Sequence, residues 1–432
     1  MHLEIDRNVK PIQLPVRKVP VAVKEKLRFE LDRLSDLEII TPVQVPTEWI
    51  SATVVVMKPD GRIRLCIDPK PLNKALKRNH YPTPTIDEIL SELSKARLFS
   101  VLDAKNGFWH VELDEASSYL TTFATPWGRY RWKRMPFGIS PAPEEFQRRM
   151  TEALEGLDGV KVIHDDILLY AVGDSDDEAG IDHDKKLRAR LQRCQEKNIK
   201  LNLDKLKLRL KEVSYLGHRI SAEGLKVDTK KIEAITEMLA PTDRRGVQRL
   251  LGMINYVQKF APGLSELTAP IRDLLKSENQ FMWDKDVHGK CLLKIKEVLI
   301  STPVLKYFDQ DKNTVVQCDA SESGLGACIM QDGHPIAYAS RSLTQTECNY
   351  AQIEKELLAI VFAMERLENY VYGRHVTVES DHKPLEIICK KSLLSAPKRR
   401  QRMQLRLQKF DFTVEYKKGK DVPSRYTQQS VY

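Results

Sequence analysis

The 432-residue sequence has no cysteine pairs, no long apolar run and no extreme composition, and each absence excludes a class of protein. Its seven cysteines are scattered and never form a CxxC pair, which argues against a disulfide framework or a zinc site. No apolar run approaches the roughly 20 residues of a membrane span, and the segment MHLEIDRNVK has no signal-peptide core. We therefore expect a soluble protein without an export signal, with reduced intracellular thiols.

What is present is a globular composition with a moderate excess of positive charge. Hydrophobic residues make up 42% of the chain and charged residues 30%, and a length of 432 residues predicts two or three domains. The net charge of +9 and the pI near 9.0 permit a polyanionic partner without requiring one. The motifs therefore have to identify any partner.

The segment VKVIHDDILLY, residues 160–170, places two adjacent aspartates between two apolar, β-prone runs. Residues 161–163 and 167–169 are predicted to form a hairpin, so that His164, Asp165 and Asp166 fall at its turn. Like charges at a hairpin tip repel each other, and a divalent metal held by oxygen ligands relieves the repulsion. A solvated aspartate-rich turn is the other interpretation, and the segment alone leaves the two about even.

Two patterns near the N-terminus predict a helix and a second hairpin. Leucines at helical spacing favour a helix over Val23–Ile40; they are Leu27, Leu31, Leu34 and Leu37. Two β-branched runs in SATVVVMKPDGRIRLCID flank the turn signal Pro59-Asp60-Gly61. Lys58, Arg62 and Arg64 flank this turn, which is either an ordinary solvated turn or a grip for a triphosphate.

A third carboxylate follows in LFSVLDAKNGFWHVELD. The apolar run from Leu98 to Leu102 predicts a strand that ends at Asp103, and alternation at Trp109, Val111 and Leu113 predicts a second strand. An aspartate at a strand end is often only a cap or a turn residue. Its importance depends on whether Asp103 meets Asp165 in space.

Two further polar stretches each have two interpretations. In FATPWGRYRWKRMPFG, residues 123–138, aromatic residues alternate with cations, which suits stacking and phosphate contact but also an amphipathic strand with a basic outer face. The acidic stretch GDSDDEAGIDHD, residues 173–184, has irregular spacing and a polar setting. We predict a solvated loop there rather than a metal site.

Residues 228–300 are predicted to be helical, and a new domain is expected from about Thr302. The helices show two apolar stripes that are expected in the core, formed by Ile232, Ile235 and Met238 and by Leu250, Leu251, Ile254 and Tyr256. Beyond residue 302, NTVVQCDASESGLGACIMQ predicts two strands, of which the first ends at Asp319. A helix over Tyr350–Tyr370 carries Glu356 beside its apolar stripe, and the strand HVTVESD ends in Asp381.

Several blocks in order resemble the reverse transcriptase of a Gypsy-class LTR retrotransposon polyprotein. They cover nearly the whole chain: MKPDGRIRLCIDPKPLNK, FSVLDAKNGFW, TTFATPWGRY, MPFGISPAPEEFQ, DDILLY, SYLGHRIS and LLGMINYVQKFAPGLSELTAPIRDLL. The resemblance implies a multidomain α+β and α/β fold, a right-hand polymerase followed by an RNase H-like domain. It divides the chain into fingers and palm over 1–227, a helical thumb and tether over 228–301, and an RNase H-like domain over 302–432.

The resemblance also implies an activity, RNA-directed DNA polymerisation with two metals. Asp103 and Asp165 would be the main metal ligands and Asp166 a supporting carboxylate, with Mg²⁺ as the expected ion and Mn²⁺ as a substitute. The substrates would be a DNA primer paired to an RNA or DNA template, and deoxynucleoside triphosphates. Lys58 and Arg64 would contact the incoming triphosphate.

Further positions correspond to the family's contacts with nucleotide and primer. Phe108 would lie under the sugar and exclude a 2′-hydroxyl, which selects deoxynucleotides, and Phe137 with Gly138 would lie beside nucleotide and template. Tyr215-Leu216-Gly217 would grip the primer end. Ile163 replaces an aromatic residue that the family often has two positions before the first aspartate of the dyad, so we expect altered primer contact rather than loss of activity.

Asp319, Glu356 and Asp381 resemble the carboxylate set of an RNase H domain, which cuts the RNA of an RNA–DNA hybrid with two metals. The basic stretch PKRRQRMQLRLQK, residues 397–409, is expected to form a hybrid-binding helix. The family's fourth catalytic aspartate has no counterpart, because the chain reads DVPSRYTQQSVY and the adjacent Pro423 argues against a helix at Asp421. We therefore expect an incomplete RNase H domain that binds hybrid and cleaves poorly.

One competing interpretation is a domesticated relic that binds nucleic acid without polymerising. Five retained residues count against it, since a relic has no chemical need for all of them: Asp103, Asp165, Asp166, Lys58 and Phe108. Protease and integrase motifs are missing from the sequence, so we expect a piece of a larger polyprotein. The resemblance implies a cytoplasmic protein with retroelement particles as one setting, and it leaves monomer and homodimer open.

Overall fold

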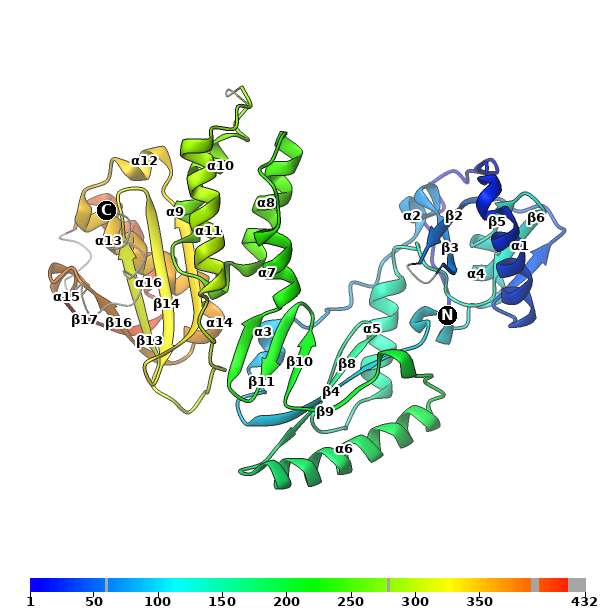
Figure 1. Cartoon of the computed structure of the whole chain (residues 1–432), viewed down its shortest axis with the longest axis horizontal. Coiled ribbons are helices and arrows are strands. Elements are labelled where there is room, and N and C mark those ends of the chain that lie inside the picture. Colours follow the sequence, from blue (N-terminus) through cyan, green and yellow to red (C-terminus); the bar gives the residue numbers. More distant parts are fainter. Residues whose placement is uncertain (59–60, 278–279, 390–395, 419–432) are drawn as a thin grey trace. The chain divides into compact units, whose positions relative to one another are not determined.

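The computed structural model describes residues 1–58, 61–277, 280–389 and 396–418, so the predicted turn at Pro59-Asp60 and the candidate Asp421 lie outside the described residues. The chain divides into two compact units, one with residues 1–85 and 97–210 and the other with residues 86–96 and the chain from residue 211 (Figure 1). The division at residues 227 and 301 stays a prediction. None of the helices in the described ranges is long and apolar enough to cross a membrane.

The first unit is built on two sheets. The five-stranded sheet has the order β1-β6-β5-β2-β3, with β1 Ile40–Val43, β2 Ser51–Met57, β3 Ile63–Asp68, β5 Phe123–Thr125 and β6 Gly128–Trp132. The four-stranded sheet has the order β7-β8-β4-β9, with β4 Ala96–Asp103, β7 Val160–Ile163, β8 Asp166–Val172 and β9 Lys207–Leu210. The predicted β2–β3 hairpin is confirmed, with Val54 opposite Cys66.

Helices complete the first unit: α1 Val21–Asp36, α2 Lys70–Ala75, α4 Glu115–Leu120, α5 Ala142–Ala153 and α6 Asp176–Glu196. In α1, Leu27, Leu31 and Leu34 are buried as predicted, but Leu37 lies beyond the helix and its side chain is 55% exposed. In β6, Tyr130 and Trp132 are buried while Arg129 and Arg131 are not. Within β6 the basic aromatic stretch is therefore an amphipathic strand, with the rings of Tyr130 and Trp132 in the core.

Two predictions for the first unit are wrong. No second strand follows Asp103, because Gly107–His110 forms a 3₁₀ turn in which Trp109 packs on Trp132 with ring centres 6.3 Å apart. The acidic stretch 173–184 is not a loop but largely the start of α6. The Ser175 side chain accepts a hydrogen bond from Glu178 N, and acidic side chains in the first turn stabilise the positive end of the helix dipole.

The second unit begins with a three-stranded sheet of β10 Glu212–Tyr215, β11 His218–Ser221 and β12 Gly224–Val227. Its nearby helices are α3 Ile86–Leu90, α7 Thr229–Thr236, α8 Arg244–Val257, α9 Leu264–Leu267, α10 Ala269–Asp273 and α11 Lys290–Ile300. Leu250, Leu251 and Ile254 are buried as the stripe predicts. Tyr256 is not a core residue, because its side chain is 42% exposed and its hydroxyl bonds to the β10–β11 turn.

The rest of the second unit is a mixed five-stranded sheet with the order β15-β14-β13-β16-β17 (Figure 1). Its strands are β13 Val315–Ala320, β14 Gly324–Gln331, β15 His334–Ser342, β16 His375–Ser380 and β17 Asp411–Tyr416. Its helices are α12 Gln345–Cys348, α13 Gln352–Arg366, α14 Glu368–Val371, α15 Pro384–Ile388 and α16 Lys398–Leu407. The apolar face of α13 packs on β13 and β14 in one core.

Candidate active sites

The two adjacent aspartates lie at a tight hairpin between β7 and β8. Ile163 pairs with Asp166, so His164 and Asp165 form the turn and Asp166 is the first residue of β8. His164 takes a left-handed backbone conformation with φ 54°, and its N–H donates to Gln147 Oε1 at 2.6 Å. The Gln147 amide also donates to Val162 O, so one side chain of α5 braces the hairpin.

The structure brings Asp103 to this hairpin. β4 is almost entirely buried and ends at Asp103, and the backbone N–H of the next residue, Ala104, donates to Asp165 O at 3.0 Å. Burial, followed by the negative charge of Asp103, raises the pKa of both Asp165 and Asp166 above the ordinary value of 3.8. The three carboxylates therefore share one electrostatic environment.

Lys205 is a neighbour of this cluster that the sequence analysis missed. Its ammonium lies 2.7 Å from Asp103 Oδ2, and its positive charge lowers the pKa of Asp165 and Asp166 against the larger opposing effect of burial. The two paired residues are 102 positions apart in the chain. No local pattern signals such a contact.

The cluster has the chemistry of a site for a hard divalent cation. Asp165 Oδ1 is buried and has no hydrogen-bond partner among the described residues, and a buried acceptor of this kind normally requires one. A Cβ added at Gly107 would lie 2.4 Å from the same oxygen, so the backbone passes directly against it. Carboxylate oxygens alone suit Mg²⁺, and a cation would offset both the burial and the repulsion that raise the pKa of Asp165 and Asp166.

Three of the four predicted nucleotide contacts lie close to one another. The Arg64 guanidinium lies 5.2 Å from the Phe137 ring centre, and the Phe137 and Phe108 ring centres are 4.9 Å apart. Phe108 in turn lies 5.6 Å from Phe146, whose ring would meet a Cβ at Gly107. Lys58 lies at the tip of the β2–β3 hairpin, where its N–H donates to Arg62 O.

Tyr215, Leu216 and Gly217 form the predicted hairpin between β10 and β11. Tyr215 pairs with His218, so the turn consists of Leu216 and Gly217, with φ of 49° and 74°. The Tyr215 side chain is buried. Burial, and then the charge of Lys259, lowers the pKa of His218 to about 4, so its imidazole is neutral at physiological pH.

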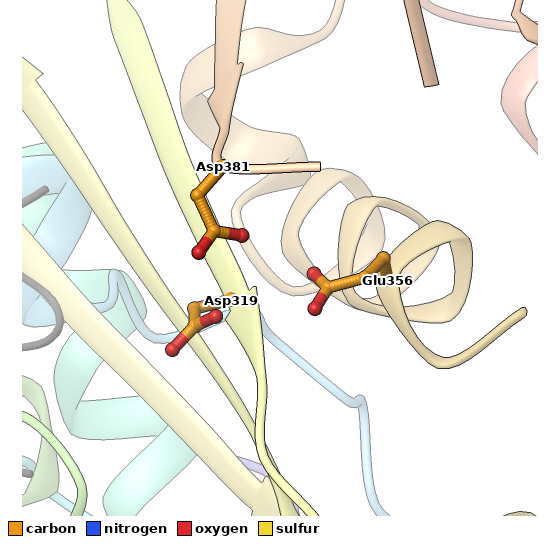
Figure 2. A group of neighbouring side chains, drawn as sticks. All are labelled: Asp319, Glu356 and Asp381. Atoms are coloured by element: carbon orange, nitrogen blue, oxygen red, sulfur yellow. The ribbon is translucent and has the colours of Figure 1, made fainter. Parts of the chain in front are cut away.

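The second acidic cluster lies on the mixed sheet of the second unit. β13 and β16 are parallel neighbours with Gln317 opposite Glu379, so Asp319 and Asp381 follow at the same level. Figure 2 shows these carboxylates and that of Glu356, from α13, turned toward one another. Their ligand atoms all lie within 4.8 Å of one another, a spacing that can hold a metal ion.

Two side chains that the sequence analysis missed support this cluster. The Gln352 amide, one turn before Glu356, donates to Glu356 Oε1 at 2.7 Å and to Ala320 O at 3.2 Å. Glu266 in α9 accepts hydrogen bonds from Ser321 and Ser323, in the loop directly after β13. Gln352 has a weak local signal in its helical spacing from Glu356, whereas Glu266 has none.

The predicted basic helix is α16, and three of the six cations in the stretch 397–409 are paired within the protein. Arg399 bonds to Glu354 at 2.7 Å, Arg406 bonds to Glu365, and Lys409, just beyond the helix, bonds to Glu368 at 2.7 Å. The other three, Lys398, Arg400 and Arg402, form no ion pair within the described part of the chain.

Two family models match the regions of the chain that contain the two acidic clusters. The model for reverse transcriptase (RNA-dependent DNA polymerase) matches residues 56–220, and the model for the RNase H-like domain found in reverse transcriptase matches residues 309–410. The structure resembles that of a foamy viral protease-reverse transcriptase in complex with dsDNA, with a TM-score of 0.85 and 24% identity over 95% of this chain and 86% of that chain. The fold is a retroviral-type polymerase followed by an RNase H-like domain.

Similar curated proteins indicate which group of reverse transcriptases the chain resembles. It is 35% identical over 405 residues to the retrovirus-related Pol polyprotein from transposon 297 of Drosophila melanogaster, covering 92% of this chain and 37% of the relative. It is 33% identical to the polyprotein from transposon 412 of the same organism, covering 95% of this chain and 33% of the relative. The transposon Tf2-3 polyprotein of Schizosaccharomyces pombe is 29% identical and matches over 97% of this chain and 32% of its own length.

The chain carries a reverse transcriptase domain and an RNase H-like domain and is homologous to the Pol polyproteins of Gypsy/Ty3-class retrotransposons. It spans about a third of the length of these curated relatives. Membership of the reverse transcriptase family implies a divalent metal, which agrees with the oxygen-only ligands of both acidic clusters.

Proposed function

We propose that this chain is an RNA-directed DNA polymerase that extends a DNA primer on an RNA or DNA template with deoxynucleoside triphosphates. The observation that carries the proposal is a series of contacts in the first unit, in which the Arg64 guanidinium lies over the Phe137 ring and Phe137 packs on Phe108. Phe108 packs on Phe146, and Phe146 and Asp165 Oδ1 both border Gly107, the residue before Phe108. These residues offer a cation for phosphate, rings for a sugar and base, and oxygens for a metal. A relic that only binds nucleic acid needs no buried, repelling carboxylates.

Asp103, Asp165 and Asp166 would hold two Mg²⁺ ions, which supply Lewis-acid stabilisation of charge on the reacting phosphate. Lys58 and Arg64 bind the triphosphate, and the Arg64 side chain is oriented by the Phe137 ring beneath it. Phe108 lies between Phe137 and Phe146, so its ring is fixed from two sides. A fixed ring under the sugar excludes a 2′-hydroxyl.

The RNase H-like domain is proposed to cut the RNA of an RNA–DNA hybrid, with Asp319, Glu356 and Asp381 as metal ligands. Three carboxylates hold a second metal more weakly than four, so cleavage by the 432-residue chain is expected to be slow. Asp421 is the only acidic residue that follows β17 in the given sequence and is therefore the candidate for a fourth ligand. Fast Mg²⁺-dependent cleavage that persists in Asp421→Asn would contradict the expectation of a weak site.

The contact with the RNA–DNA hybrid is assigned to the cations of α16 that form no ion pair in the described residues. Lys398, Arg400 and Arg402 have no intramolecular carboxylate partner in the described residues, whereas Arg399 and Arg406 are held by α13. A cation already neutralised by a carboxylate releases fewer counterions when it meets a phosphate. The unpaired three therefore carry most of the proposed contact with the nucleic acid.

Primer extension tests the proposed activity. An oligo(dT) primer on poly(rA) with Mg²⁺ and dTTP should be extended by the wild type, and Asp165→Asn should lower the rate about a thousand-fold, because several kcal/mol of metal-dependent stabilisation are lost. Asp158→Asn, at a side chain that is 87% exposed, is a matched control with the same chemical change. Equal extension by wild type and Asp165→Asn would refute the assignment of the polymerase site.

The same assay tests Phe108. Replacement by valine should open space for the 2′-hydroxyl, so the preference for dTTP over UTP is expected to fall by about ten-fold or more. Tyr119→Val removes a ring elsewhere in the first unit and serves as the control. A wild type that uses UTP as well as dTTP would exclude the proposed role of Phe108.

A further inference from the structure

The turn between β10 and β11 is contacted by a side chain from a distant helix. Tyr256, in the last turn of α8, places its hydroxyl 2.5 Å from the carbonyl oxygen of Leu216. The two residues are 40 positions apart in the chain and both belong to the second unit. With 42% of its surface exposed, Tyr256 does not serve mainly to fill the core.

The turn needs such support because its backbone is unfavourable. Leu216 is not glycine and has φ 49°, in the left-handed region that L-residues other than glycine, asparagine and aspartate rarely occupy. Its carbonyl oxygen accepts from the Tyr256 hydroxyl and also lies 3.0 Å from His218 Nδ1, which donates in the neutral ring. Two donors on one carbonyl fix the peptide that joins Leu216 to Gly217.

The next residue, Gly217, lies directly against the same tyrosine. A Cβ at Gly217 would lie 2.5 Å from the Tyr256 hydroxyl oxygen and 3.5 Å from Lys231 Cε, so only glycine leaves room for this contact. Lys231, in α7, places its ammonium 5.4 Å from the Tyr256 ring centre. The position of the turn is therefore set by contacts from α7 and α8 as well as by its own strands.

We propose that Tyr256 is a positioning residue for polymerisation, which holds the Leu216–Gly217 turn where it contacts the primer end. The inference rests on the proposed function, in which this turn grips the primer. Tyr256 touches neither the nucleotide nor the carboxylates in this assignment. It acts through the Leu216 carbonyl, so its loss misplaces the primer 3′ end without weakening nucleotide binding.

Tyr256→Phe tests the inference, because it retains the ring and its packing on His218 and removes only the hydroxyl. The maximal rate of single-nucleotide addition is expected to fall about three- to ten-fold, the usual effect of one hydrogen bond. The KM for dTTP and the affinity for primer–template should change less than about two-fold, which separates positioning from binding. Tyr372→Phe, which removes a hydroxyl from a 62% exposed ring of the RNase H-like domain, is the matched control.

A second readout is independent of catalysis. A primer with 2-aminopurine at its 3′ terminus reports the environment of the primer end when the protein binds, and Tyr256→Phe should give a smaller fluorescence change than wild type and Tyr372→Phe at equal saturation. If the wild-type protein binds the primer and changes its fluorescence but adds no nucleotides, the proposed function is refuted. The comparison of fluorescence between wild type and Tyr256→Phe would still decide the inference about Tyr256. Equal fluorescence changes in wild type and Tyr256→Phe would overturn the inference.

Discussion

The two acidic clusters of this chain are assembled by different means. In the RNase H-like domain, two parallel neighbouring strands and one helix bring the ligand atoms of Asp319, Glu356 and Asp381 within 4.8 Å of one another. In the first unit, Asp165 and Asp166 are adjacent in sequence at a hairpin, and Asp103 is bonded to Lys205. The negative charge of Asp103 contributes to the raised pKa of both Asp165 and Asp166.

The two clusters show that carboxylate ligands of the same kind can be oriented by different neighbouring groups. Glu356 is oriented by Gln352, whereas the aspartate hairpin is oriented by Gln147 and by the peptide after Asp103. The polymerase cluster also has a counter-charge that reaches solvent, because the Lys205 side chain is 63% exposed. Substitutions in one cluster and its support should therefore leave the other cluster unaffected.

The strongest test of this independence is a pair of ligand substitutions. Asp165→Asn should lower primer extension about a thousand-fold and leave hybrid cleavage within about two-fold, and Asp319→Asn should do the reverse. Extension is measured on poly(rA)–oligo(dT) and cleavage on a labelled RNA–DNA hybrid, with the same protein preparations. If either substitution lowers both activities equally, the two clusters are not independent sites.

A smaller effect is expected from the support of Glu356. Gln352→Ala removes the amide that orients this ligand, and loss of such a partner should lower hybrid cleavage about 10- to 100-fold with extension unchanged. Gln345→Ala, at an exposed position in α12, is the control. Unchanged cleavage in Gln352→Ala would mean that strand and helix backbones alone orient Glu356.

The charge balance of α16 is tested by salt dependence. Replacing Lys398, Arg400 and Arg402 together by glutamine should reduce the slope of log affinity against log salt for hybrid binding by about 2 to 3. The same replacement of Arg399, Arg406 and Lys409 removes equal charge but breaks ion pairs, so it should change the slope by less than about 1. Equal changes in the two triple variants would contradict the pairing argument.

The smallest expected effect concerns stability and pH. The pKa of Asp165 is raised in the folded state above its unfolded value of 3.8. The ionised carboxylate therefore lowers the free energy of unfolding at pH 7. This destabilisation decreases as the pH falls toward 3.8, because the group becomes protonated in the folded protein. Asp165→Asn should therefore melt about 2 °C or more above wild type at pH 7 without metal, with the difference shrinking toward pH 4. Mg²⁺ should raise the melting temperature of the wild type more than that of the variant.

Periodicity and strand-end position predicted much of what builds both clusters. Alternating β-branched runs predicted the β2–β3 and β7–β8 hairpins, and strand patterns placed Asp319 and Asp381 at strand ends. That these two share a site with Glu356 was implied by the resemblance to a family. Parallel pairing brings Asp319 and Asp381 together because equal positions on neighbouring strands end at the same edge. The resemblance to a family supplied the roles that pattern alone left open.

The predictions that failed depend on competing local signals or on distant contacts. Acidic composition suggested a loop at residues 173–184, but the Ser175 cap and the acidic first turn favour a helix start. The alternation after Asp103 suggested a strand, but Trp109 packs better on Trp132 from a 3₁₀ turn. Lys205, Glu266 and Tyr256 act through residues far along the chain, which no window of sequence detects.

The close approach at Gly107 has a consequence for copies of this sequence that accumulate substitutions. A single methyl group there would meet Asp165 Oδ1 at 2.4 Å and the Phe146 ring at 2.8 Å, so alanine would displace a carboxylate, a ring, or both. A copy with alanine at position 107 would retain every acidic residue and still be expected to lose polymerisation. A comparison of the catalytic carboxylates alone would classify such a copy as intact, although one added methyl group is expected to inactivate it.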